Sequence, residues 1–348
     1  MSSIAMDPAR LGTLASGNFV VDRVKIIDHY PPEQILATVL EVQQSGGGGP
    51  YNVLKDLCAM QVDYPLAAAG CIGTDADGRW IIDDCHAAGL DTSQLCRLEG
   101  ETTSTTDAMT VESTGRRTFF HCQGANARFS ETMVNVDRSN ARIFYLGYLT
   151  LLKELDRIEE DGRTGASRML ESARAAGMTT VVDMVSIPHS NFEAIVRAAA
   201  PHCDLLIANE LEAAMASGID PSDVDGDEWI RVDRLAEACD RLLSLGVPQA
   251  VVVHCERGAV LKTADGATLV QPSLALPTDQ IRGGTGAGDA FAAGLIHALH
   301  QGWALEEGMR LAVNAAAACL TQPGASEGLR PVEQCLELAA RFGYRKWA

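Results

Sequence analysis

The 348-residue sequence has few basic residues, and this shortage excludes several classes of partner. It has 28 Lys and Arg against 46 Asp and Glu, which gives a formal net charge of −18 at pH 7. Nucleic acids and anionic membrane surfaces are normally bound by clustered basic side chains, so we expect no nucleic-acid and no membrane partner. A nucleotide remains compatible with this charge, because backbone N–H groups can bind its phosphates locally.

The sequence also lacks any long hydrophobic run. No stretch of about 18 consecutive apolar residues is present, and residues 1–21 lack the basic and apolar regions typical of a signal peptide. The ten cysteines are scattered, with no C-x-x-C pair. In a chain that is 47% hydrophobic, such cysteines are typical of reduced, mostly buried thiols rather than of disulfides or zinc ligands. We therefore expect a cytoplasmic protein with a large core.

Short apolar runs alternate with longer helical patterns through most of the chain. This alternation predicts a single large α/β domain over residues 1–348, with parallel strands and helices on both faces of the sheet. Binding sites in such sheets lie beyond the carboxyl ends of the strands. The strand candidates are 64–73, 142–146, 179–183, 204–207 and 250–253, and the clearest helical patterns are 165–176, 192–199 and 232–245.

One polar, β-branched stretch, residues 102–122, interrupts the alternation. A turn at 113–116 predicts a β-hairpin with strands at 106–111 and 117–122. A second extended run, 17–27, lies near the N-terminus. Strands outside a parallel pattern often form a separate small sheet. We predict that segments 17–27 and 102–122 form a lid over the mouth of the main site.

Four consecutive glycines occur in the segment 45–50, between two helical patterns at 32–43 and 51–61. A tetraglycine is usually a flexible linker. A linker here would divide the first α/β unit, so close approach of the backbone to a ligand is the preferred interpretation.

The most informative segment is the glycine-rich turn 283–289, which precedes a helical pattern at 289–300. Free N–H groups at a helix N-terminus bind anions. Asp289 could cap the helix, or it could take the proton of a hydroxyl that attacks a phosphoryl group. No Lys follows the glycines as a P-loop requires, and Asp289 stands where a dinucleotide fingerprint needs glycine. The turn therefore favours phosphoryl transfer at a site that is neither a P-loop nor a dinucleotide-binding turn.

Several motifs together resemble those of the PfkB, or ribokinase-like, carbohydrate kinase family. The resemblance covers almost the whole chain, in the family's order. It implies a ribokinase-like three-layer α/β sandwich with a central, mainly parallel sheet and a small β-sheet lid. It also implies phosphorylation of a hydroxyl of a sugar or sugar-like molecule, with ATP and magnesium. The motifs are Gly47-Gly48-x-x-x-Asn52, the G-x-x-G-x-D-x-x-G stretch 70–78, the segments 115–118 and 124–126, Asn209-x-x-Glu212 and Gly286-Ala287-Gly288-Asp289.

The resemblance assigns a role to each motif residue. Asp22 can also be read as a solvated acid, Phe120 as a residue that packs the hairpin, and Asn209 with Glu212 as a helix cap followed by an acidic first turn. In the roles that the resemblance implies, Asp289 would be the catalytic base, and the anion hole would consist of Gly286, Ala287 and Gly288. The acceptor would be contacted by Asn18, Asp22, Gly47, Gly48, Asn52 and Phe120. The nucleotide would be contacted by Asn209, Thr285, Gly258 and Asn314, and Glu212 would hold magnesium through water.

The sequence departs from the family pattern at three positions around the nucleotide. Gly283 replaces the usual Asp, which argues against a monovalent-cation site of the kind that some relatives have. Val253 and Cys255 replace a hydroxyl residue and a glycine, so we expect ATP to sit differently or to bind less tightly. The retained base and glycines favour an active kinase.

Two alternatives to a sugar kinase stay open at this point. One is a nucleoside kinase of the same superfamily, and the other is a catalytically impaired homologue that binds sugar or nucleotide. Relatives often dimerise through the lid, so the resemblance also implies a homodimer.

Overall fold

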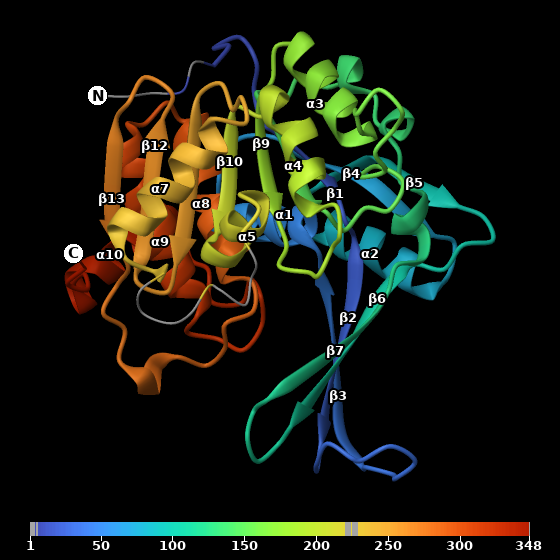
Figure 1. Ribbon diagram of the computed structural model, residues 1–348. Coiled ribbons are helices and arrows are strands. Elements are labelled where there is room, and N and C mark those ends of the chain that lie inside the picture. The colour runs from blue at the N-terminus through green and yellow to red at the C-terminus, as the bar shows by residue number, and fades with distance from the viewer. Residues whose placement is uncertain (1–3, 5, 220–223, 225–228, 348) are drawn as a thin grey trace.

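Two β-sheets organise the chain in the computed structural model, which describes residues 4, 6–219, 224 and 229–347 (Figure 1). From one edge to the other, the large sheet consists of β13 (Thr268–Pro272), β12 (Gly258–Thr263), β11 (Ala250–Cys255), β10 (Leu205–Asn209), β9 (Thr179–Met184), β8 (Ile143–Leu149), β1 (Thr13–Gly17), β4 (Leu66–Gly73) and β5 (Asp91–Leu98). The small sheet consists of β3 (Val39–Gly47), β2 (Val20–Ile27), β6 (Ser104–Val111) and β7 (Arg117–Cys122).

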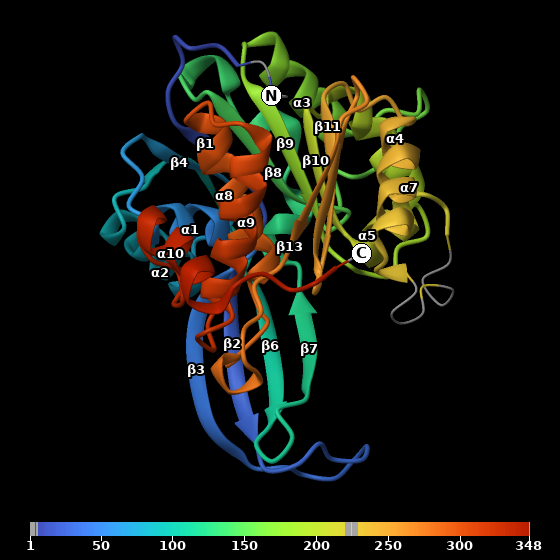
Figure 2. The ribbon, with the colours of Figure 1, turned by 90° about the vertical axis from the view of Figure 1, so that its left-hand side faces the viewer.

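The large sheet lies between two layers of helices. Seven neighbouring strands of this sheet, β5, β4, β1, β8, β9, β10 and β11, run parallel to one another. Strands β12 and β13 are antiparallel to their neighbours. The helices are α1 (Gly49–Ala59), α2 (Ala76–Ala87), α3 (Gly165–Ala175), α4 (Phe192–Ala199), α5 (Glu210–Ala216), α7 (Val232–Leu243), α8 (Ala287–His300), α9 (Leu305–Cys319) and α10 (Val332–Phe342). Figure 2 shows α1, α8 and α9 on one face and α4 and α7 on the other. The predicted three-layer fold with a mainly parallel central sheet and a small second sheet is confirmed.

The central strands are apolar because helices cover both of their faces. In β8, for example, all residues except Tyr148 are buried. The apolar runs predicted as strands correspond to β4, β8, β9, β10 and β11. The pairing of β1 with β8 brings Gly17 beside Gly147, and the pairing of β10 with β11 brings Asn209 beside His254, both at the carboxyl edge of the sheet. The segments that carry polar motif residues therefore meet at this edge.

The small sheet projects from the body below this edge in Figure 1. Strand β2 pairs in parallel with β6 and antiparallel with β3, and β6 forms the predicted hairpin with β7. The extended run predicted at 17–27 divides between the sheets: Gly17 ends β1 in the large sheet, and β2 begins at Val20. Asn18 and Phe19 are the link between them.

The helical pattern predicted at 32–43 is wrong, because residues 39–47 form strand β3. Apolar side chains such as Val39, Leu40 and Val42 are exposed on this strand. A strand signals itself by alternating buried and exposed positions, and β3 has no such alternation over residues 39–45. Its pairing with β2 along its length, which the sequence does not reveal, determines the structure.

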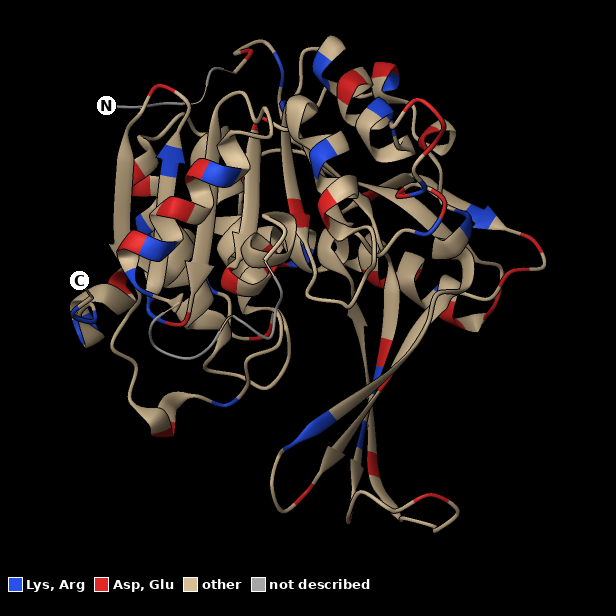
Figure 3. Ribbon diagram, viewed as in Figure 1, with Lys and Arg blue, Asp and Glu red and all other residues tan. Residues whose placement is uncertain are grey.

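The ten cysteines all lie in the described part of the chain and are free thiols. Burial is the main cause that raises the pKa of the thiols of Cys71, Cys85 and Cys239 to about 12. None of the helices in the described residues has the length and apolar character needed to cross a membrane. Acidic and basic positions are mixed along the ribbon in Figure 3.

Candidate active site

The glycine-rich turn leads into helix α8 through Gly286, which is the N-cap residue. Its φ of 81° lies in the left-handed region, and a Cβ added there would lie 2.6 Å from the carbonyl oxygen of Ala325. Only glycine satisfies both conditions without a shift of the backbone. The first-turn N–H groups of α8, starting at Ala287, have no partner within the helix and can bind an anion.

Asp289 lies in the first turn of α8, but its carboxylate does not cap that helix. The hydroxyl of Tyr148 donates to Oδ1 at 2.7 Å and to Oδ2 at 2.8 Å, and Asn52 Nδ2 donates to Oδ2 at 2.8 Å. Tyr148 belongs to β8 and Asn52 to α1, so the acid is held by two other elements. The structure therefore places Asp289 beside the glycine-rich turn, and the capping alternative does not describe it.

The side chain of Asp289 is buried, with 4% of its surface exposed. Burial raises its pKa to about 6, the hydrogen bonds from Tyr148 and Asn52 oppose this shift, and the negative charge of Asp22 adds to it. A general base works best when its pKa is close to the working pH. Asp289 combines such a pKa with a position next to the glycine-rich turn.

Asp22 faces the same region from strand β2 of the small sheet. A Cβ added to Gly47 would lie 2.1 Å from Asp22 Oδ2, so the carboxylate packs directly on the Gly47 backbone. Burial raises the pKa of Asp22 to about 6, and a hydrogen bond with Thr106 opposes the shift. Strand pairing places His121 on the Asp22 face of the small sheet, where it contacts Thr106 at 3.1 Å. Phe120, the neighbouring residue, is half-exposed and lies on the opposite face.

Asn18 and Gly48 lie where the chain passes between the two sheets. Asn18 is fully buried; its Oδ1 accepts a hydrogen bond from the N–H of Tyr148 at 2.6 Å, and its own N–H donates to Gly147 at 3.0 Å. Gly48 has a φ of 90°, and a Cβ there would lie 2.2 Å from the carbonyl oxygen of Asn18. Both residues therefore lie at the junction of the two sheets, and the side-chain Nδ2 of Asn18 has no hydrogen-bond partner among the described residues.

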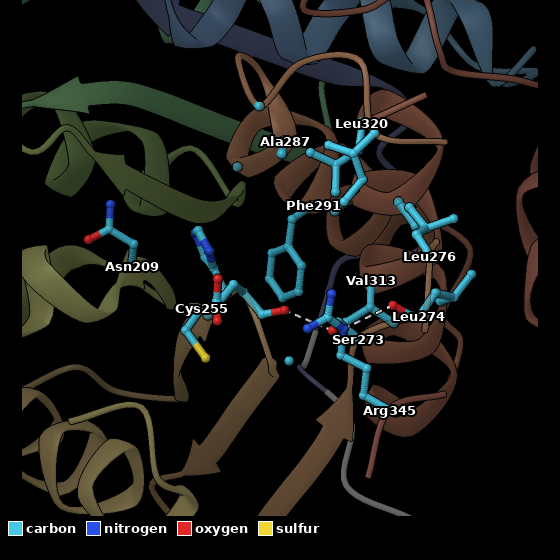
Figure 4. Close-up of a pocket in the computed structure, with 18 of the residues that line it drawn as sticks. Asn209, Cys255, Ser273, Leu274, Leu276, Ala287, Phe291, Val313, Leu320 and Arg345 are labelled. Atoms are coloured by element: carbon cyan, nitrogen blue, oxygen red, sulfur yellow. Dashed lines mark hydrogen bonds between the residues drawn. The ribbon is translucent and has the colours of Figure 1, made fainter. Parts of the chain in front are cut away.

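A cavity of about 420 Å³ opens on the other side of the α8 N-terminus (Figure 4). Phe291 projects into it, with Leu276, Val313 and Leu320 as further apolar walls. Cavities of this size with mainly apolar walls and a few polar groups are typical of cofactor and ligand sites. The ring of His254 lies 5.0 Å from that of Phe291, and burial lowers its pKa to about 4, so this wall is neutral.

Of the residues predicted to contact the nucleotide, Asn209 and Gly258 line this cavity. Asn314 is fully buried behind it, with Nδ2 directed at the carbonyl of Leu336 at 3.5 Å. Its neighbour Val313 reaches the cavity instead.

Thr285 is a contact point between the glycine-rich turn and the small sheet. Its Oγ1 accepts a hydrogen bond from Nη1 of Arg117 at 2.6 Å. Arg117 is the first residue of β7, beside the hairpin tip. The small sheet therefore reaches the glycine-rich turn from across the site.

Glu212 and Asp183 form a pair of buried carboxyl groups near Asn209. Asn209 caps α5 in a capping box with Glu212, and Ser186 donates to Glu212 Oε1 at 2.9 Å. Burial raises the pKa of Glu212 to about 7, and burial together with the charge of Glu212 raises that of Asp183. A nearby cation would offset this charge, so the pair fits magnesium. The described residues contain no group of three or more His, Cys, Asp or Glu placed to hold a metal, but magnesium needs only one or two protein carboxylates beside water and phosphate.

The glycine-rich turn does not fit a monovalent cation held by position 283. Gly283 provides no side chain, and the carbonyl oxygens of Thr285 and Ala325 accept hydrogen bonds from Cys319 Sγ at 3.3 and 3.0 Å. The thiol thus joins this turn to the loop after α9.

Three residues in this region were not singled out as site residues in the sequence: Tyr148, Asp183 and Arg117. Tyr148 and Asp183 come at the carboxyl ends of apolar strands, and this position was an available signal. Arg117 lies in the quoted segment 115–118, but its contact with Thr285 has no local signal, because it spans 168 residues.

A buried acid beside a glycine-rich helix start that can bind an anion, with a cavity of nucleotide size behind it, is typical of small-molecule kinases, which are phosphotransferases with an alcohol acceptor. The chain belongs to the pfkB family of carbohydrate kinases, whose family model matches residues 15–331.

Relatives of similar sequence include ribokinases and other sugar kinases. The ribokinase of Arabidopsis thaliana is 25% identical over 320 residues, which cover 90% of this chain and 76% of the relative. The 2-dehydro-3-deoxygluconokinase of Escherichia coli K12 is 25% identical over 266 residues, 74% of this chain and 81% of the relative.

Solved structures share the fold over nearly the whole chain. The Arabidopsis thaliana ribokinase complexed with ribose and ATP superposes with a TM-score of 0.76 and 23% identity, covering 94% of this chain and 98% of that one. The nucleoside kinase of Methanocaldococcus jannaschii gives 0.71 and 17%, covering 95% and 98%.

Proposed function

We propose that this kinase transfers the γ-phosphoryl group of ATP to a hydroxyl of a neutral sugar or sugar-like alcohol. The observation that carries the proposal is the position of Asp289, between the anion-binding start of α8 and the Asp22 carboxylate of the small sheet. ATP would place its base in the cavity behind α8 and its phosphates at the turn. The acceptor would lie between Asp289 and Asp22, whose oxygens can accept several hydroxyl hydrogen bonds.

The chain's own groups would divide the chemistry as follows. Asp289 takes the proton of the attacking hydroxyl, and the N–H groups at Gly286, Ala287 and Gly288 stabilise charge on the transferring group. Such transfer depends mainly on positioning and on fixed donors aimed at the developing charge.

Glu212 would hold magnesium through water, with Asp183 as a second acid and Asn209 near the phosphates. When bound, magnesium neutralises phosphate charge.

The charges near Asp289 favour a neutral acceptor. Asp22 faces Asp289 from β2, while the basic side chains of that strand, Arg23 and Lys25, are paired with Asp77 and Asp107 at 2.5 and 2.9 Å. An acidic sugar would add a further negative charge beside two carboxylates.

Neutral sugars are therefore expected to be phosphorylated at least about tenfold more efficiently than a sugar acid. Repulsion between the carboxylate of a sugar acid and the two carboxylates of the site should weaken its binding by more than about 1.4 kcal/mol, which corresponds to a factor of ten. Assays of ADP release with ribose, other neutral sugars and 2-dehydro-3-deoxygluconate would measure kcat/KM for each. Preference for the sugar acid would contradict the neutral-acceptor proposal.

A nucleoside is the second candidate acceptor, because the His121 ring on the Asp22 face could stack on a base while Asp22 binds the ribose hydroxyls. Inosine and adenosine belong in the same assays. ATP and acceptor binding with no phosphorylated product would instead indicate an impaired homologue.

We also propose that the small sheet is a lid on a single kinase domain. It consists of strand β3 in addition to the segments near 17–27 and 102–122. The hydrogen bond from Arg117 to Thr285 supports this role, because it joins the hairpin to the phosphate-binding turn. A closed lid would exclude water, which otherwise competes as the acceptor.

The lid is also a candidate surface for a homodimer. Its strand β3 exposes Val39, Leu40 and Val42, and β7 exposes Phe119 and Phe120, each with 45–59% of its surface accessible. An exposed apolar edge strand of this kind is usually covered by another chain.

We also propose a cytoplasmic location, which the ten free thiols support.

Substitution of Val42 by Glu is expected to convert a dimer into a monomer, because it places a charge in the proposed apolar interface. Light scattering after size-exclusion chromatography measures the mass. Val270→Glu, on the exposed edge strand β13, is the control and should leave the dimer intact. A monomeric wild-type protein would refute the dimer.

A further inference from the structure

Tyr148 and Asn52 both donate side-chain hydrogen bonds to the proposed base. Its hydroxyl lies 2.7 and 2.8 Å from the two oxygens of Asp289, and its backbone N–H lies 2.6 Å from Asn18 Oδ1. One residue thus contacts both the base and the junction between the large sheet and the lid.

We propose that Tyr148 is the positioning residue of Asp289: its hydroxyl orients the carboxylate toward the acceptor and links the base to the lid junction. The proposal rests on the kinase function proposed above and adds a residue to it.

The hydrogen bonds leave one oxygen of the base more available than the other. The single hydroxyl proton of Tyr148 is shared between Oδ1 and Oδ2, and Oδ2 also accepts from Asn52, whereas Oδ1 has no second donor among the described residues. A carboxylate oxygen has two lone-pair directions, so Oδ1 retains one for the acceptor hydroxyl. Tyr148 can therefore remain bound while Asp289 Oδ1 takes the proton.

The link to the lid runs through Asn18. This residue separates β1 from β2, is fully buried, and holds both Tyr148 and Gly147 by hydrogen bonds. The Asn18 carbonyl also packs against Gly48, where β3 leads into α1. Two lid strands therefore meet at the residue that fixes the backbone of Tyr148.

The ionisable groups around Asp289 predict how the loss of this hydroxyl would act. Burial is the largest cause that raises the pKa of Asp289, and the Tyr148 hydrogen bond is the largest that lowers it. Removal of the hydroxyl should therefore raise this pKa further. Since the base must be ionised, activity should then be lost at a higher pH than in the wild type. Among the described residues, further ionisable groups that interact with Asp289 are acidic: Asp22 from β2, Asp56 from α1, Tyr145 from β8, Asp183 from β9, Glu212 from α5 and Cys319 from α9.

The test compares Tyr148→Phe with Tyr51→Phe. Tyr51 is the matched control, because its hydroxyl also donates to a carboxylate, Asp84 Oδ2 at 2.5 Å, away from Asp289. The acidic limb of kcat/KM against pH should move up by about one unit in Tyr148→Phe, the size expected for one lost hydrogen bond to a charged group, and should stay in place in Tyr51→Phe. An unmoved limb in Tyr148→Phe, or an equal shift in both variants, would overturn the proposal.

A second readout does not depend on turnover. Carbon-13 NMR of aspartate-labelled protein follows the Asp289 carboxyl, which is assigned by its loss in Asp289→Asn. If the Asp289 pKa is higher in Tyr148→Phe than in the wild type, but neither protein shows turnover, the Tyr148 role is kept and the kinase function is rejected. Turnover with an unchanged Asp289 pKa would reject the Tyr148 role alone.

Discussion

Replacement of Asp289 by Asn is expected to lower kcat by about 10³-fold, the range typical of a lost general base. The amide has the size of the carboxylate and its oxygen can still accept the Tyr148 hydrogen bond, but it cannot take the acceptor proton. Since burial of the charged form is unfavourable here, the neutral amide should leave the fold intact. Steady-state ADP release measures kcat, and thermal unfolding measures the fold.

Asp83→Asn is the matched control for this substitution, because Asp83 is an exposed acid of helix α2. It should retain wild-type kcat. Activity of Asp289→Asn close to that of the wild type would reject the assigned base, whereas equal loss in both variants would point to a general effect of removing acids.

Replacement of Gly286 by Ala is expected to lower kcat by about 10²-fold or more, as the loss of a fixed donor to the transferring group does in other enzymes. Gly286 has a φ of 81°, and the new Cβ would lie 2.6 Å from the carbonyl oxygen of Ala325. The turn must therefore shift, and the N–H groups at the start of α8 would move away from the phosphate. Measurement of kcat and of KM for ATP tests this.

Gly302→Ala separates backbone strain from the effect on the site. Gly302 follows the other end of α8 with a φ of 70°, and no atom lies within 4 Å of an added Cβ. It should lose some stability through strain in the left-handed region but keep its kcat. If both variants keep full activity, the turn does not act as the anion hole.

The large sheet was predictable from the sequence because its central strands are buried on both faces. The apolar runs at 142–146, 179–183 and 250–253 cannot remain in water, and their spacing by helical patterns leaves few arrangements. Strand β3 was not predictable in this way. Its side chains over residues 39–45 are exposed, so only its pairing with β2 distinguishes it from a helix.

The candidate site was predictable in its residues more than in their contacts. The turn around Asp289 stands out because a helix start with several glycines has a local physical meaning. Asn18 and Asn52 were also selected, as acceptor contacts, and that role stays a prediction; their hydrogen bonds to Tyr148 and Asp289 were not foreseen. Which donor meets which acceptor depends on how α1, β8 and α8 pack, and no local pattern contains that information. The hydrogen bond of Arg117 to Thr285 is hidden for the same reason.

Phosphorus-31 NMR of ATP mixed with neutral sugars and nucleosides would test the central proposition most directly. With the wild-type protein we expect the γ-phosphate signal to be replaced by that of a phosphomonoester of the acceptor, and with Asp289→Asn we expect the ATP signals to persist. If no acceptor in the series gives an ester, or if wild type and Asp289→Asn release inorganic phosphate at the same rate, the proposed transfer from ATP through Asp289 is contradicted.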